Sequence, residues 1–361
     1  MATARTAELH RLAKRIATAL PPFVEEVVVT GSVSRGVADD ISDIEMLVVT
    51  SEPLELDQCF EHARTAGLEG LDTWGPQGTE TKRVFGYREE VPIELVWWSR
   101  ELAEASVDAI LAGEPSGSGD ALANGVALRT VGLLEAWQAR LRAYPDELAA
   151  ARIEEAALTW GGYAPAGWLT LVRPGERVAL VERLLDDATR VLRIVYALNR
   201  VWEPTTKRLA DRVEALPVKP QRLAERLEDA LTEPDPVRAA LVMNELQLET
   251  VELAPSGPNV VRARRWLSDV VEVLRHASKG PWSNSPHAIR PTHTRAARAS
   301  TRCAGAHGRG GGRAPGPSSR LPSRSARPRL PRRRRAARRP GRRAPARHLD
   351  HEVRSRDGAP A

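Results

Sequence analysis

The chain of 361 residues contains only two cysteines, Cys59 and Cys303. Two cysteines cannot form a disulfide framework, and they do not have the spacing of a zinc ligand pair. The first 20 residues are amphipathic and lack the apolar core of a signal peptide. No run approaches the roughly 18 consecutive apolar residues of a membrane span. These absences exclude a disulfide-rich secreted class, and they predict a cytoplasmic protein with no membrane partner.

The net charge of +6 conceals two parts of opposite sign. Residues 284–361 contain 21 arginines, no lysine and only three acidic residues, which are Asp350, Glu352 and Asp357. The 283 residues before them contain 32 basic and 44 acidic residues, a net charge of −12. The high isoelectric point therefore gives no reason to expect that the main body binds nucleic acid.

The tail, residues 284–361, has only six larger apolar residues, too few to offset the entropy lost on folding. We predict that this Arg/Pro/Gly/Ala-rich segment is disordered. Its run Arg332–Arg335 is typical of an arm that binds nucleic acid. A second explanation is a frameshift-like, non-functional extension, because Arg, Ala, Pro and Gly are what a G- and C-rich gene encodes out of frame. We favour the second explanation and assign no site residues to the tail.

Hydrophobic periodicity predicts an α+β fold with two structured parts. Residues 1–119 form a small mixed sheet with helices, and residues 120–283 form an all-helical bundle. The glycine-, serine- and proline-rich residues 113–119 are the predicted hinge. The expected strands are 24–30, 43–49, 80–87 and 91–98, and the expected helices of this part are 7–20, 56–66 and 102–111. The expected helices of the bundle are 126–143, 146–160, 177–198, 221–231, 236–253 and 258–276.

The stretch from Val28 to Glu45 contains most of the candidate site residues. The first strand ends in Gly31-Ser32, a turn whose backbone N–H groups and hydroxyl suit a phosphate. Twelve residues after Gly31, the second strand carries Asp43 and Glu45. Strand side chains alternate, so both carboxylates project from one face. Two adjacent carboxylates are electrostatically costly unless a divalent cation lies between them. The alternative is an ordinary turn followed by a strand with two solvated acids.

A third acid, Glu94, lies within the apolar run Pro92–Trp98. Lone charges are rare in buried strands. If this strand neighbours the Asp43 strand, the three carboxylates form a site for one or two Mg²⁺ ions, which serves phosphoryl or nucleotidyl transfer. Glu94 could instead be exposed on an edge strand. Five tryptophans are expected in the core or between the domains rather than as a platform for bases, namely Trp74, Trp97, Trp98, Trp160 and Trp168.

These residues resemble a known family. Gly31-Ser32, Arg35-Gly36, Ser42–Glu45 and the later acid Glu94 are similar to the motif of the DNA polymerase beta-like nucleotidyltransferase superfamily. The run from Ser42 to Met46 looks most like kanamycin nucleotidyltransferase and related aminoglycoside nucleotidyltransferases. Glu45 stands where much of the superfamily has Asp, a feature that the kanamycin-type enzymes share. The helical half is similar in kind, and more loosely, to the bundles of aminoglycoside adenylyltransferases.

The resemblance implies a Mg²⁺-dependent transfer of a nucleoside monophosphate, AMP from ATP, to a hydroxyl of a small molecule such as an aminoglycoside. Asp43 and Glu45 would ligate Mg²⁺, and Glu94 would be the third ligand or the catalytic base. Gly31 and Ser32 would hold the phosphates. The nucleotide-binding set is completed by Arg35, Ser42 and Lys207, which could also be ordinary solvated residues. A different class remains open, a non-catalytic, antitoxin-like module of the same fold that binds a nucleotide or a partner protein.

Overall fold

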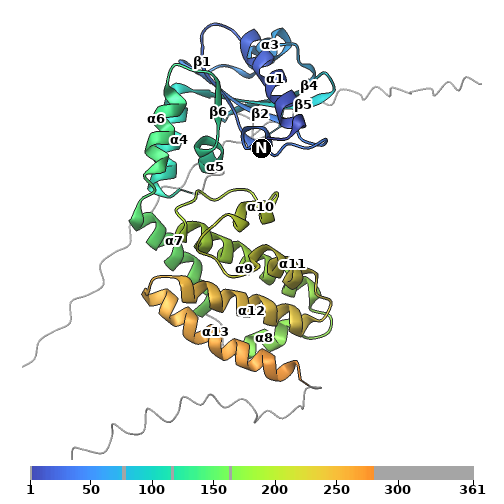
Figure 1. The fold of residues 1–361 in the computed structure, drawn as a ribbon, viewed down its shortest axis with the longest axis vertical. Helices are drawn as coiled ribbons and strands as arrows, with labels where there is room; N and C mark the ends of the chain where they lie inside the picture. Colours follow the sequence, from blue (N-terminus) through green and yellow to red (C-terminus); the bar gives the residue numbers. More distant parts are fainter. Residues whose placement is uncertain (1, 75–78, 115–117, 162–164, 280–361) are drawn as a thin grey trace, which may run out of the picture. The chain divides into compact units, whose positions relative to one another are not determined.

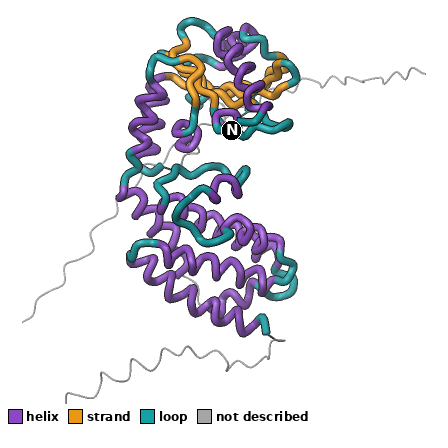
Figure 2. The backbone as a smooth tube through the Cα atoms, in the orientation of Figure 1, coloured by secondary structure: helices purple, strands orange, loops and turns teal. Residues whose placement is uncertain are grey.

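The computed structural model describes residues 2–74, 79–114, 118–161 and 165–279. The strands within these residues form one six-stranded sheet, with the order β3-β4-β5-β2-β1-β6 (Figures 1 and 2). Their bounds are β1 Val24–Val29, β2 Ile44–Thr50, β3 Glu69–Asp72, β4 Lys82–Arg88, β5 Val91–Ser99 and β6 Val126–Arg129. The four predicted strands are confirmed as β1, β2, β4 and β5, whereas β3 and β6 were not expected.

The sheet is mixed, because β2 and β5 run parallel while the other neighbours run antiparallel. Ile44, Met46 and Val48 of β2 are buried against helices α1 (Ala4–Ala19) and α3 (Leu56–Thr65). Leu47 and Val49 point to the opposite face and join the core of the later helices. Period-2 alternation thus gives β2 two apolar faces, and the predicted α+β class is confirmed.

The helix expected over residues 126–143 was predicted wrongly at its start. Residues 126–129 instead form edge strand β6 on β1, and helix α6 (Leu133–Arg142) follows. The fully buried Glu26 of β1 explains this junction. Its carboxylate accepts hydrogen bonds from the Thr130 hydroxyl (3.0 Å) and from the backbone N–H groups of Val131 (3.1 Å) and Leu133 (3.3 Å). These bonds satisfy free N–H groups at the start of α6.

The remaining helices agree with the predicted bundle, and α9 has the expected bounds of 177–198. The helices after β5 are α4 Arg100–Ala112, α5 Ser118–Ala123, α6, α7 Asp146–Leu158, α8 Pro165–Leu171, α9 Arg177–Leu198, α10 Leu209–Glu214, α11 Leu223–Thr232, α12 Pro236–Leu253 and α13 Pro258–Ala277, with a 3₁₀ turn at Thr159–Gly161. Short helices α5, α8 and α10 were not predicted. None of the helices in the described ranges is both long and apolar enough to cross a membrane.

One carboxylate is enclosed within the bundle. Asp187 of α9 is fully buried and accepts hydrogen bonds from the Trp160 indole N–H (2.9 Å) and from Arg183 Nε (2.9 Å). Burial raises the pKa of Asp187 to about 6, against the opposing effect of Arg183. Asp187 is thus a structural acid of the bundle.

The tryptophan prediction is confirmed for four residues and wrong for the fifth. Trp97, Trp98, Trp160 and Trp168 are buried, but Trp74 is 64% exposed. Trp74 contacts Phe85, with 6.1 Å between ring centroids, and lies 5.4 Å from the Arg83 guanidinium. It follows the edge strand β3, and no further layer of the described residues covers it.

The hairpin between β4 and β5 turns on two residues with positive φ, Glu89 (55°) and Glu90 (65°). A two-residue loop with both central residues in the left-handed region is a type I′ turn, which favours Asn and Gly. Glu89 also forms an exposed ion pair with Arg15 of α1 (2.6 Å). The hairpin therefore uses side chains poorly suited to its backbone.

Three features of the chain organisation stay predictions, namely the domain boundary, the hinge and the tail. The boundary at residue 119 stays a prediction, because Met1–Arg290 form one compact unit in which β6 completes the sheet. Gly113 ends α4 with φ of 91°, and Ser118 begins α5, while residues 115–117 of the predicted hinge lie outside the described residues. The tail at 284–361 also lies outside them.

Candidate active site

The loop after β1 brings the backbone into contact with a carboxylate. The chain leaves β1 through Thr30 and enters the short helix α2, Gly31–Ser34. Thr30 N–H donates to the Glu45 carbonyl (2.9 Å), which ties the loop to β2. Gly31 has φ of +65°, and a Cβ atom placed there would lie 2.1 Å from Glu45 Oε2. Glycine is therefore required both by the backbone conformation and by the approach of this carboxylate.

The strand adjacency that the sequence analysis made conditional is confirmed. Asp43 directly precedes β2, and Glu45 of β2 is the register partner of Glu94 on the parallel strand β5. Glu45 and Glu94 lie on the sheet face away from α1 and α3, where the adjoining residues Leu47 and Val96 belong to the second core. Asp43, Glu45 and Glu94 all line one cavity of about 1150 Å³.

The electrostatics of the cavity centre on Glu45. Burial raises the pKa of this carboxyl, and the charges of Asp43 and Glu94 raise it further. The positive charges of Lys207 and Arg35 act in the opposite direction. Lys207, which the sequence analysis placed in the nucleotide site, thus lies close enough to act on Glu45. It lies in a turn before α10 rather than in a helix.

Glu94 differs from the other two acids in having a partner. Arg83 of β4 donates to Glu94 Oε1 at 2.7 Å and also lines the cavity. By contrast, in the described ranges neither the Asp43 carboxylate nor the Glu45 carboxylate forms a hydrogen bond or an ion pair with another residue. These two half-buried carboxylates thus differ from Glu94 in having no hydrogen-bonding partner among the described residues, although the charges of Lys207 and Arg35 act on Glu45.

Within the described residues, no group of three His, Cys, Asp or Glu side chains is arranged to hold a metal ion by itself. Mg²⁺, however, is usually bound by one or two carboxylates together with substrate phosphates and water. Asp43 and Glu45 fit that donor set, since they are adjacent hard-oxygen ligands without partners. The role of Glu94 as a third ligand stays a prediction, and in this structure its carboxylate is paired with Arg83.

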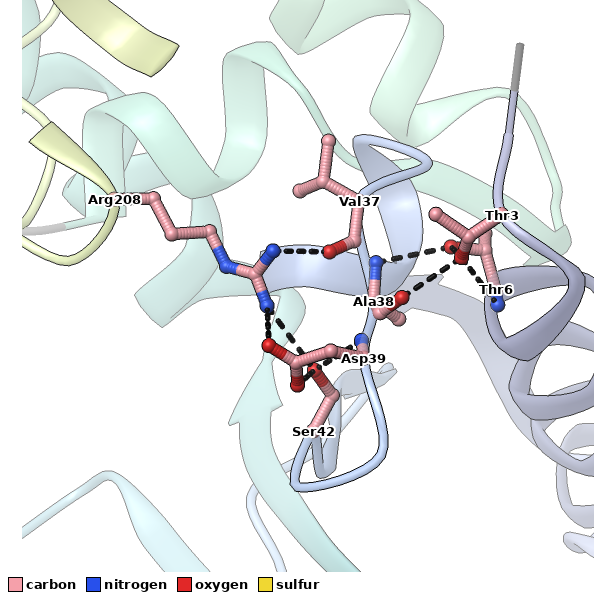
Figure 3. Close-up of polar contacts among 7 residues, drawn as sticks. All are labelled: Thr3, Thr6, Val37, Ala38, Asp39, Ser42 and Arg208. Atoms are coloured by element: carbon pink, nitrogen blue, oxygen red, sulfur yellow. Dashed lines mark hydrogen bonds and ion pairs between the residues drawn. The ribbon is translucent and has the colours of Figure 1, made fainter. Parts of the chain in front are cut away.

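The loop that leads into Asp43 is held from two sides (Figure 3). On one side, Thr3 Oγ1 donates to the Ala38 carbonyl (2.7 Å), and Ala38 N–H donates to Thr6 Oγ1 (3.0 Å). On the other side, Arg208 donates to the Val37 carbonyl and to Asp39 Oδ2 (2.6 Å). Arg208 precedes α10, so the helical part of the chain contacts the loop directly.

Ser42 and Arg35, two predicted nucleotide-binding residues, line the cavity and already have partners within the protein. Ser42 is buried, and its hydroxyl donates to Asp39 Oδ1 at 2.7 Å. Hydrogen bonding from Ser42 lowers the pKa of Asp39, with a smaller contribution from Arg208. Arg35 donates to Asp120 Oδ2 of α5 at 3.0 Å. Gly31 and Ser32 also line the cavity.

The cavity lining also includes charged residues that the sequence analysis did not select as candidates, and several of them form ion pairs. They include Arg83, Asp120, Arg208 and Arg212. Arg212 of α10 donates to the same oxygen of Asp120 as Arg35 does, at 3.1 Å. The partners of Asp120 are 85 and 92 residues away in the sequence, so no local motif marks them.

No protein-family model matches the chain, and no curated protein matches it. Among solved structures, it is similar to a nucleotidyltransferase-like protein from Exiguobacterium sibiricum 255-15. That likeness has a TM-score of 0.34 and 10% sequence identity, and it covers 76% of this chain and 92% of that chain.

Proposed function

We propose that this chain is a Mg²⁺-dependent nucleotidyltransferase that transfers a nucleoside monophosphate, AMP from ATP, to a hydroxyl of a small molecule and releases pyrophosphate. The observation that carries the proposal is the pairing of Glu45 with Glu94 across two parallel strands, beside Asp43 and Gly31, in one large cavity. Residues distant in sequence thus combine the carboxylates, the close-approach glycine and the cation, Lys207, that this transfer needs.

Each residue of the site has a distinct role in the proposed reaction. Asp43 and Glu45 would hold Mg²⁺, which supplies positive charge that neutralises the phosphates. Gly31 and Ser32 would hold the outer phosphates, with Lys207 opposite them. The acceptor oxygen forms a bond to the α-phosphorus while the bond to the pyrophosphate oxygen breaks. Glu94 would accept the proton that the acceptor hydroxyl loses, once its carboxylate is released from Arg83.

For the acceptor we propose an aminoglycoside as the first candidate. The resemblance of the stretch from Ser42 to Met46 to the kanamycin-type enzymes supports this choice. A cationic acceptor also suits the net charge of −12 on residues 1–283, which would raise its local concentration near the site.

The decisive experiment is calorimetric titration of the full chain with a non-hydrolysable ATP analogue, with and without Mg²⁺. Asp43→Asn removes one unpartnered carboxylate, and we expect Mg²⁺-dependent binding to be lost. Asp40→Asn is the matched control, because Asp40 is an exposed acid of the same loop that does not line the cavity. Both variants carry the same tail, so its non-specific attraction for nucleotides cancels in the comparison.

Loss of binding in both variants, or in neither, would contradict the proposed site. If binding is Mg²⁺-dependent, pyrophosphate release is then measured with a panel of aminoglycosides and other polyols. Release with one acceptor supports the transferase. Specific binding of the nucleotide without release for any acceptor favours the non-catalytic module.

A further inference from the structure

The cavity has a cationic wall whose organisation depends on one carboxylate. Asp120 lies near the start of α5 and is 8% exposed. Its Oδ2 accepts hydrogen bonds from Arg35 (3.0 Å) and from Arg212 (3.1 Å). Its Oδ1 accepts from the Asn124 side-chain amide (2.9 Å). Both carboxylate oxygens are therefore engaged, and the carboxylate has a defined orientation.

Two guanidinium groups share one carboxylate oxygen, so the cluster holds an excess of positive charge. Burial lowers the pKa of Arg35, Asp120 opposes this effect, and the nearby charge of Arg212 lowers the pKa further. The side chains of Arg212 and Asp120 are only 12% and 11% exposed. An anionic group in the cavity would offset this excess charge.

Arg212 also connects Asp120 to the predicted phosphate contact. Its Nε donates to the Lys207 carbonyl at 2.9 Å while its Nη1 donates to Asp120. One planar guanidinium thus joins α5 to the turn that carries Lys207. The positive charge of Lys207 acts on Glu45. Asp120 therefore has two connections. Through Arg212 it is connected to the Lys207 backbone, and it directly binds Arg35 at the end of α2.

We infer that Asp120 is a positioning residue for the triphosphate, which holds Arg35 and Arg212 on the cavity wall and, through Arg212, sets Lys207 opposite Glu45. This inference rests on the proposed function. It assigns the outer phosphates to a wall formed by Arg35, which follows α2, and by Lys207 and Arg212. Asp120 itself does not contact the phosphates.

Simple electrostatics and positioning predict opposite results for Asp120→Asn. Removal of a negative charge from the cavity alone would tighten the binding of an anion. Loss of the anchor for two guanidiniums would instead weaken it, because charge-assisted hydrogen bonds define where those groups lie. We expect the dissociation constant of the Mg²⁺–ATP analogue complex to rise on the order of tenfold.

Asp211→Asn is the matched control. Asp211 belongs to α10, lines the same cavity and is exposed. Its substitution changes the cavity charge by the same amount without removing an anchor, so we expect binding unchanged or tighter by less than about threefold. Asp120→Glu, which restores a carboxylate, should recover part of the lost affinity.

The experiment is calorimetric titration of each full-length variant with AMP, ADP and the ATP analogue in the presence of Mg²⁺. If Asp120 positions the phosphate contacts, the loss of binding affinity should grow with the number of phosphates in the ligand. General misfolding would instead weaken the binding of all three ligands alike. Arg212→Lys serves if Asp120→Asn does not fold, since lysine keeps the charge but lacks the planar fork that reaches both partners. It should show the same phosphate-dependent loss.

The possible results distinguish a failure of the proposed function from a failure of the role assigned to Asp120. Wild-type protein that binds none of the three nucleotides would refute the proposed function together with this inference. Wild-type protein that binds the ATP analogue, while Asp120→Asn or a folded Arg212→Lys binds it equally well or more tightly, would overturn the role of Asp120 and leave the proposed function standing.

Discussion

Replacement of Gly31 by alanine tests whether the close approach between the loop and β2 serves the site. A Cβ atom at position 31 would lie 2.1 Å from Glu45 Oε2 and 3.0 Å from its Cδ. Ordinary contacts begin near 3.4 Å, so the carboxylate must withdraw by more than 1 Å. The obstacle is the end of a flexible side chain, so Glu45 moves and the fold survives.

Two separate effects are therefore expected for Gly31→Ala. The positive φ of 65° costs a non-glycine residue about 1–2 kcal/mol, which lowers the free energy of unfolding by that amount. The displaced Glu45 no longer lies beside Asp43. We expect the affinity for Mg²⁺ and the ATP analogue to fall by roughly 10–100-fold, the range found when groups that orient metal ligands are altered.

Gly175→Ala is the control for the backbone effect. Gly175 has φ of 93°, and no atom lies within 4 Å of the position where its Cβ would be. Urea denaturation should show a similar loss of stability in both variants, whereas titration with Mg²⁺ and the nucleotide should show weaker binding only in Gly31→Ala. Equal affinity in the two variants would refute the reasoning that the glycine exists to admit Glu45.

Two further predictions concern stability. The pKa of Asp187 is raised to about 6 in the folded state, so the protonated carboxyl stabilises the fold. Its contribution to the free energy of unfolding is full below about pH 4 and is lost as the pH rises through 6. In urea denaturation measured from pH 4 to pH 7, the free energy of unfolding of the wild type should fall by about 3 kcal/mol relative to that of Asp187→Asn. A difference in the free energy of unfolding between the two proteins that does not change with pH would contradict this prediction. Glu90→Gly relieves a positive φ of 65° in the type I′ turn, and it should raise the free energy of unfolding by about 1 kcal/mol, measured by urea denaturation. An unchanged or lower midpoint would argue against strain there.

The sequence predicted those parts of the fold that have strong local patterns. Strands β2 and β5 are rich in β-branched and aromatic residues, and α9 repeats apolar residues at helical spacing over its whole length. Strand β3, with the sequence Glu69-Gly-Leu-Asp72, has almost no strand propensity. It forms because Glu69 and Asp72 pair with Tyr87 and Phe85 of β4, a tertiary contact that no local pattern reports.

The candidate site also contains residues that a local sequence pattern marks and residues that only the folded chain brings together. Asp43 and Glu45 could be predicted because two carboxylates at alternate positions of a strand follow a glycine turn within 15 residues. Glu94 could be proposed only on condition that two strands were neighbours, a condition that the structure meets. Asp120 could not be found, because its partners come from α2 and α10 and meet only in the folded chain. The roles of all these residues stay predictions until binding is measured.

The parallel register of β2 and β5 has a consequence for folding. A slip of one residue between these strands would turn Glu94 into the apolar layer beneath α1 and α3, and it would place Ile93 or Leu95 in the cavity. Burial of an unpaired carboxylate among apolar side chains costs several kcal/mol, so the misaligned sheet is strongly disfavoured. Glu45 and Glu94 therefore favour the correct alignment of the two strands, independently of any ligand.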